Sequence, residues 1–244
     1  PPSSTVCAPP ATHLPRSAAC PGSPGSTATI TCRKMSRAWL VGSGASPVGD
    51  DQVRVCVEVG PGVDATVRSV AATVVYAARG GGTGWQTEVR VADGARLRWR
   101  PEPVILTERA RHRAVTRVHA AAGAEIALDE VLVFGRTDER PGALHSTLDV
   151  RRDDRPVLLT SLDTELPGWS GPGGIEGARV VASRLHLAPD PGDDRSGERA
   201  DEPPGGRPGA AATVLEAAPG ARLAVAVGPD VDTTRDALDA LVSG

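Results

Sequence analysis

Three segments share one frame and decide the fold: VEVGPGVDATVRS (residues 57–69), VRVADGARLRWRP (residues 89–101) and VHAAAGAEIALDE (residues 118–130). Each joins two runs of alternating apolar and polar residues through a short turn with a glycine, at Gly62, Gly94 or Gly123. A period of two residues is typical of strands with one buried and one solvated face. Glycine supplies the positive φ that hairpin turns require. The segments therefore predict a repeated strand–turn–strand unit.

The copies follow one another at intervals of about 30 residues, a spacing typical of stacked repeats. A fourth copy, LEAAPGARLAVAV, covers residues 215–227. We expect a mainly β fold, built from stacked hairpins or β-helix-like layered sheets, with a β-sandwich as the competing geometry. Because aromatic residues make up only 2% of the chain, Ala, Val and Leu have to fill the core.

Composition divides the chain into four parts. The start of the chain is rich in Pro, Ser, Gly and Ala, and residues 189–210 are rich in Pro, Gly and charge; both compositions are typical of segments without a packed core. The predicted parts are a disordered leader (1–34), a β-rich body (35–188), a flexible insertion (189–210) and a C-terminal strand pair with a helix that packs on the body (211–244).

The C-terminal helix is predicted from PDVDTTRDALDALVSG, in residues 229–244. An Asp or Thr at its start can cap the helix, and Val231, Leu238 and Leu241 fall on one face. A helix this short needs packing against the body to be stable.

Charge and cysteine usage limit the classes of partner and compartment. The net charge of -3 and the pI near 6.0 do not favour nucleic acid or anionic lipid. No apolar run approaches the roughly 18 residues of a membrane span, and no secretory signal is visible, so we expect a cytoplasmic protein. Cys7, Cys20, Cys32 and Cys56 contain no CxxC pair, and scattered thiols are expected in preference to a disulfide or metal cluster.

Enzyme signatures are not evident, and we expect a protein that is not an enzyme. RGGGTG (79–84) lacks the Lys-Ser/Thr of a phosphate-binding loop, and GSGAS (42–46) has its serines misplaced for a nucleophile elbow. His112 and His119 have a spacing that fits no ligand pair, and both are expected at the surface.

Three acidic residues leave two interpretations open: Asp51 at a strand entry, Glu102 within PEP, and Glu130 before VLVFGR. They can be ordinary turn carboxylates. Alternatively, they can supply weak, exchangeable oxygen ligands along the path of a divalent ion.

An ordered set of motifs between residue 39 and about residue 187 resembles the urease accessory protein D family (UreD, also called UreH). The motifs are AWLVGSGASPVGDDQVRV, VRSVAATVVY, WRPEPVI, EVLVFGR and GGIEGARVVASRLHL. Each is weak alone, but the ordered set is fairly specific.

The resemblance implies a scaffold that docks on apo-urease with accessory protein F and the nickel-carrying GTPase G, so that nickel in transit reaches the urease active site. It implies a mostly β fold with a helical element near the C-terminus. Asp51, Glu102 and Glu130 become candidates for the nickel path, and Arg136 for ordering a turn or contacting a partner.

The alternative function is a β-rich ligand- or carbohydrate-binding module, with Trp85 or Trp99 exposed as a sugar platform. The chain has only four Trp, one Tyr and one Phe, and this scarcity counts against it because sugar platforms use several aromatic side chains.

Overall fold

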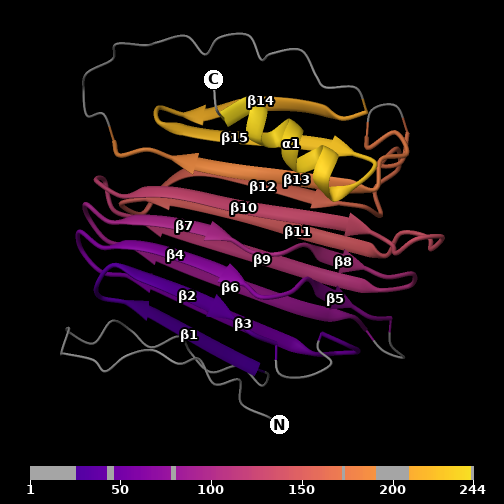
Figure 1. Ribbon diagram of the computed structural model, residues 1–244, viewed down its shortest axis with the longest axis horizontal. Helices are drawn as coiled ribbons and strands as arrows, with labels where there is room; N and C mark the ends of the chain where they lie inside the picture. Colours follow the sequence, from indigo (N-terminus) through magenta and orange to yellow (C-terminus); the bar gives the residue numbers. More distant parts are fainter. Residues whose placement is uncertain (1–25, 43–46, 78–80, 172–173, 191–208, 243–244) are drawn as a thin grey trace.

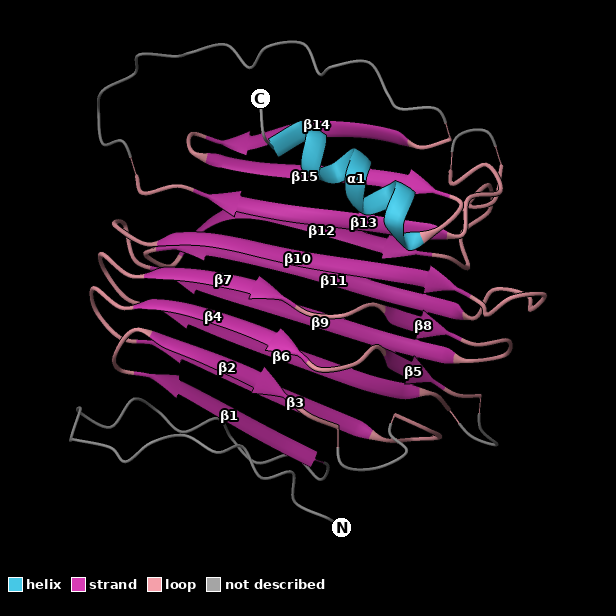
Figure 2. Cartoon of the chain, in the orientation of Figure 1, coloured by secondary structure: helices cyan, strands magenta, loops and turns pink. Residues whose placement is uncertain are grey.

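The chain winds between two facing β-sheets as a β-solenoid of about four turns (Figure 1). This computed structural model describes residues 26–42, 47–77, 81–171, 174–190 and 209–242. A single helix is present in that part of the chain, and it lies against one sheet (Figure 2). The expected mainly β, β-helix-like architecture is confirmed.

Sheet A contains six of the described strands. In spatial order they are β1 (Ser26–Cys32), β3 (Gln52–Val59), β6 (Thr83–Val91), β9 (Arg111–Ala120), β11 (Ala143–Arg152) and β12 (Arg155–Asp163).

Sheet B contains the other nine described strands. The main path is β14 (Ala211–Ala218), β15 (Ala221–Gly228), β13 (Val180–Leu187), β10 (Glu125–Phe134), β7 (Arg96–Arg100), β4 (Asp64–Ser69) and β2 (Ser36–Leu40). Two short strands lie off this path: β8 (Val104–Leu106) pairs with β10, and β5 (Thr73–Val75) pairs with β8. Helix α1 (Val231–Val242) follows β15.

The first three sequence copies form corners of the solenoid. In each, one strand lies in sheet A and the next in sheet B. The strands of these copies pair in parallel with strands of the neighbouring turns, except that β10 also pairs antiparallel with β13. Gln52 pairs with Gly84 and Thr83 with His112, so successive turns take 32 and 29 residues. The two strands of these copies do not pair with each other, because the turn between them crosses the core. Only the fourth copy, β14 and β15, is an antiparallel hairpin.

The corner glycines differ in what they provide. Gly62 and Gly94 both have φ of 65°, as expected, whereas Gly123 is not in the positive-φ region. A Cβ on Gly123 would lie 2.5 Å from Asp93 Oδ1, which accepts a hydrogen bond from Gly123 N at 2.9 Å. Gly123 is therefore required by the close approach of the preceding turn, not by its own φ.

The main core lies between the sheets and consists largely of small aliphatic side chains. Val55, Val57 and Val59 of β3 point into it, and Val53 packs against it, as the alternation predicts. Trp99 is buried in this core and Trp85 is partly buried against it, so neither side chain forms the exposed sugar platform that the carbohydrate-binding alternative requires. Trp99 lies two residues after Leu97 on β7, and Trp85 lies four residues before Val89 on β6, so both Trp side chains point inward with these residues.

Helix α1 covers the outer face of sheet B over β13, β14 and β15. Asp230 caps it, because Asp230 Oδ1 accepts a hydrogen bond from Thr233 N at 2.8 Å. Leu238 is fully buried, and Val231 and Leu241 pack beside it, which confirms the predicted apolar face.

Two details differ from the expected organisation. Strand β1 lies within residues 1–34 and pairs with β3, because STATITC alternates like a strand although its surroundings are rich in Pro and Ser. Cys32 is a free buried thiol, but Cys56 is disulfide-bonded, so scattered thiols are the wrong description for Cys56. The remainder of the predicted leader, residues 1–25, and most of the predicted insertion, residues 191–208, lie outside the described residues.

Candidate functional site

A set of polar side chains interrupts the apolar core halfway along the strands. On β10, Leu128 belongs to the main core cluster, and Leu132 and Phe134 belong to a second cluster near the other end of the solenoid. Glu130 has the same inward phase and lies between these two clusters. It therefore sits in the middle of a strand, not at a strand end.

Polar side chains also occur at inward positions of other strands, in more than one cross-strand row. Ser183 is the cross-strand partner of Glu130, and Thr116 is the partner of Thr87. We call this inward-facing set the polar seam, and its members are Thr83, Thr87, His112, Thr116, Glu130, Ser146 and Ser183.

Glu130 is the only carboxylate of the polar seam. Glu130 as a whole is partly accessible to solvent, but its carboxyl group is surrounded by protein. This burial raises the pKa of Glu130 to about 7, and a hydrogen bond with Ser146 opposes part of the shift. Near neutral pH, the carboxyl group can therefore gain or lose a proton with little change in free energy.

His112 is buried, which corrects the expectation of a surface histidine. Its Nδ1 lies 2.6 Å from Thr83 Oγ1, and burial lowers the pKa of His112 to about 4. The ring is neutral at physiological pH and has one nitrogen lone pair. The alternation of Val118 and Ala120, continued backward along β9, indicates this inward position in the sequence. His119 has the opposite phase and faces outward from sheet A.

The hydroxyl groups of the polar seam provide further weak donors and acceptors. Trp85 Nε1 donates to Thr87 Oγ1 at 3.1 Å, so this hydroxyl also satisfies a polar atom of the core. Carboxylate oxygen, neutral imidazole and hydroxyl oxygen are all groups that divalent ions accept. No group of three or more His, Cys, Asp or Glu placed to hold a metal occurs within the described ranges.

Asp51 lies at the entry to β3, away from Glu130. Its Oδ2 accepts a hydrogen bond from Val48 N at 3.0 Å, and its own N donates to Val48 O at 3.3 Å. These contacts close the turn that contains Gly49, whose φ is 68°. A turn-stabilising role is therefore visible for Asp51.

Glu102 lies in the connection between β7 and β8, and its carboxylate faces helix α1. Its Oε2 is 3.4 Å from Arg235 Nη2, and both side chains are partly exposed. Its backbone N donates to Ser69 Oγ at 2.7 Å. The structure does not bring Asp51, Glu102 and Glu130 together.

Arg136 orders the turn after β10. Its Nε donates to Glu139 Oε1 at 2.9 Å, and its backbone N donates to Glu139 Oε2 at 3.1 Å. Hydrogen bonds from the Arg136 side chain and backbone lower the pKa of Glu139 to about 2. Arg179 holds the same turn by donating to the Arg136 carbonyl oxygen.

In the part of the chain that the structure describes, no helix is long and apolar enough to cross a membrane. The two facing sheets, with an apolar core that a few polar side chains interrupt, define a β-solenoid protein.

The chain belongs to the UreD urease accessory protein family, whose sequence profile matches residues 26–243. The resemblance deduced from the ordered motifs is therefore confirmed. Members of this family are non-catalytic accessory proteins involved in urease maturation. This assignment replaces the carbohydrate-binding alternative.

Individual relatives support the assignment. The urease accessory protein UreD of Streptomyces coelicolor is 35% identical over 215 residues, covering 84% of this chain and 79% of that protein. UreD 2 of Saccharopolyspora erythraea is 33% identical over 211 residues, covering 84% and 72%. UreD of Frankia casuarinae is 37% identical over 165 residues, covering 62% of this chain. The match spans only 52% of the Frankia protein.

Proposed function

We propose that this chain is a cytoplasmic scaffold that docks on apo-urease together with accessory proteins F and G, and assists the insertion of nickel. The observation that carries the proposal is the family match over residues 26–243. Nickel is the cargo of this reaction and is in transit, so weak ligands suit it better than a closed cage.

Within this proposal, Glu130 is the strongest candidate for a residue on the nickel path. It is an inward-facing carboxylate in the polar seam, and its raised pKa permits exchange between a proton and a cation near neutral pH. His112 extends the candidate path toward Thr83, since a neutral imidazole can bind a divalent ion.

Asp51 and Glu102 are also proposed to contact nickel in transit, but they differ from Glu130 in their present contacts. Each has a partner in the free protein, Val48 N for Asp51 and Arg235 for Glu102, so each would have to exchange that partner for the ion or for a docked protein. Arg136 is proposed as a partner contact, because its side chain is 55% exposed beside the ordered turn.

Removal of this gene from the host that encodes it tests the proposal at limiting nickel. We expect urease subunits to accumulate with little bound nickel and little activity, and restoration when the gene is returned. Full urease activity in the deletion strain would refute the proposed function.

Expression of the Glu130→Gln variant in the deletion strain tests the proposed nickel path separately from the scaffold role. Glu125→Gln is the matched control, because Glu125 lies on the same strand with its side chain outside the core. We expect nickel content per urease to fall with Glu130→Gln only, at equal levels of folded accessory protein. Equal nickel content with both variants would remove Glu130 from the path without affecting the scaffold role.

A further inference from the structure

The outer face of β2, β4 and β7 carries a concentration of positive charge that the nickel path does not use. These three strands contain five arginines and one aspartate and no other charged residue, although the whole chain has a net charge of -3. On β7, Leu97 and Trp99 are buried, so the alternating arginines face outward. Helix α1 covers β13, β14 and β15 and leaves this half of the face open in the described part of the chain.

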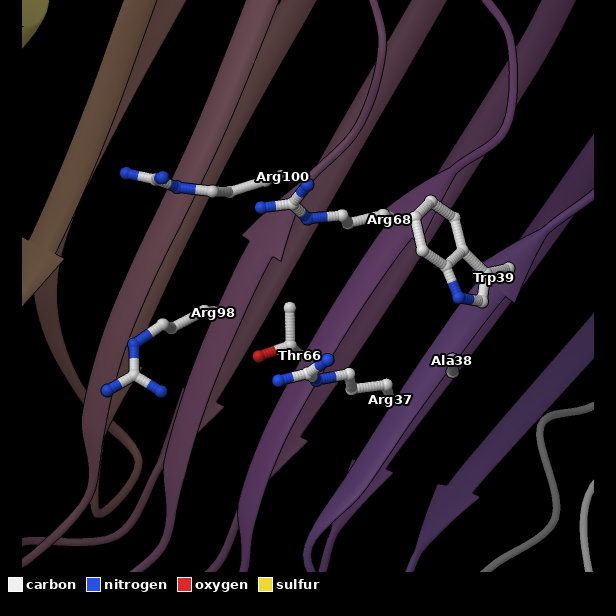
Figure 3. A pocket seen from close by; sticks show the side chains of 7 residues that line it. All are labelled: Arg37, Ala38, Trp39, Thr66, Arg68, Arg98 and Arg100. Atoms are coloured by element: carbon white, nitrogen blue, oxygen red, sulfur yellow. The ribbon is translucent and has the colours of Figure 1, made fainter.

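Parallel pairing places these side chains in two rows across the strands. One row is Arg37, Thr66 and Arg98, and the other is Trp39, Arg68 and Arg100. Together with Ala38 they line a pocket of about 300 Å³ (Figure 3). Figure 3 shows the side chains of Arg68 and Arg100 extending in the same direction along the second row, so that the Arg68 guanidinium group reaches toward the stem of Arg100.

Nearby carboxylates balance only part of this charge. Glu125 Oε2 accepts from Arg96 Nε at 2.7 Å, and Asp64 Oδ1 accepts from Arg98 at 2.9 Å. Asp129 lies 3.4 Å from Arg100, but it is already held by Arg184 at 2.6 Å. Arg37 and Arg68 form no ion pair with any described residue. Like charges directly opposite each other on adjacent strands are destabilising, so the Arg68–Arg100 pair costs stability in the free protein.

An apolar surface adjoins the arginines. Trp39 is 49% exposed, and Val41 and Val70, at the ends of the same two strands, are also exposed. The Val70 backbone N donates to Leu40 O, which holds these strand ends side by side. Exposed Trp beside Arg is the composition of protein-binding surfaces.

We propose that this face, lined by Arg37, Trp39, Arg68 and Arg100, docks an acidic segment of a partner protein. The guanidinium fork matches carboxylates in a two-point geometry, and an apolar side chain next to those carboxylates would rest on Trp39. The apolar neighbour and the negative net charge of the chain favour a protein segment over a nucleic acid. The inference does not depend on the nickel path.

The spacing of the row defines a probe. Neighbouring strands lie about 4.8 Å apart, and side chains four residues apart on a helix lie about 5–6 Å apart. A fluorescein-labelled, alanine-based helical peptide with Leu, Glu and Glu at positions i, i+4 and i+8 can therefore follow Trp39, Arg68 and Arg100. Binding of this peptide to the full chain is measured by fluorescence anisotropy at low and high salt.

We expect saturable binding that weakens with salt, and that weakens roughly tenfold or more in the Arg37→Glu/Arg68→Glu variant. The matched control is Arg113→Glu/Arg117→Glu, two exposed arginines of β9 on the outer face of sheet A, which should bind normally. Trp39→Ala should weaken binding of this peptide, but not of a version with Ser in place of Leu.

Without peptide, the Arg68→Glu variant should unfold at the same temperature as the unmodified chain or at a higher one, because the substitution removes the repulsion from Arg100. If charge reversal disturbs folding, Arg68→Gln provides the same comparison. Equal binding by both double variants, no binding by the unmodified chain, or tighter binding of a twelve-nucleotide RNA than of the peptide would each overturn the proposal.

Discussion

Arg184 of β13 forms a two-point ion pair with Asp129 of β10: Nε donates to Oδ1 at 2.6 Å and Nη2 to Oδ2 at 2.9 Å. Arg184 Nη1 also lies 2.8 Å from Asp239 of helix α1. Only 9% of the Arg184 side chain is exposed, and these carboxylates raise its pKa. One guanidinium therefore ties two strands to the helix that covers them.

Replacing Arg184 by Gln should destabilise the fold by about 3 kcal/mol, because it leaves the Asp129 carboxylate largely buried with a weaker partner. Arg98→Gln is the control, since its pair with Asp64 is exposed and should contribute less than about 1 kcal/mol. Urea unfolding gives both values. Equal losses for the two variants would show that burial does not set the contribution of Arg184.

Glu130 should make the fold less stable as the pH rises. The folded chain keeps the Glu130 proton up to about pH 7, whereas the unfolded chain releases it near pH 4.5. Stability should therefore fall by about 3 kcal/mol between these pH values and remain low above them. Glu130→Gln should remove this slope in urea unfolding at pH 5 and pH 8. Glu125→Gln is the control, and the same slope in both variants would contradict the assignment.

His112 should act in the opposite direction at acidic pH. Its folded pKa of about 4 lies below the value of about 6.5 in the unfolded chain. Protonation of the unfolded chain should therefore reduce stability as the pH falls from about 6.5 to 4, by about 3 kcal/mol. His112→Gln should flatten this acid limb, while His119→Gln, on the outward face of the same strand, should leave it unchanged. A steep acid limb that persists in His112→Gln would have to come from other groups.

The corner glycines should respond differently to alanine. Gly94→Ala should cost about 1–2 kcal/mol because Gly94 has φ of 65°. Gly123→Ala should be destabilising because its Cβ displaces the Asp93 carboxylate. In the background of Asp93→Ala, the effect of Gly123→Ala should shrink and that of Gly94→Ala should persist. A double-mutant cycle from thermal unfolding measures this coupling, and additivity at Gly123 would exclude the close approach as its cause.

The sequence by itself determined the class of fold, the helix and the family. Period-two alternation, a spacing of about 30 residues and the cap at Asp230 are local properties of the chain, and they are sufficient because each solenoid turn repeats the same burial pattern. The same alternation also contained the inward position of His112, since Val118 and Ala120 set the phase of β9.

Only the tertiary structure decided which strands pair and which side chains meet. A glycine turn between alternating strands is compatible with a hairpin or with a corner between two sheets, and the turn itself does not distinguish them. Arg68 and Arg100 become neighbours only because β4 and β7 lie one turn apart in parallel register. Glu130 becomes a buried carboxylate only because two sheets close over the middle of β10, which no local pattern of residues can show.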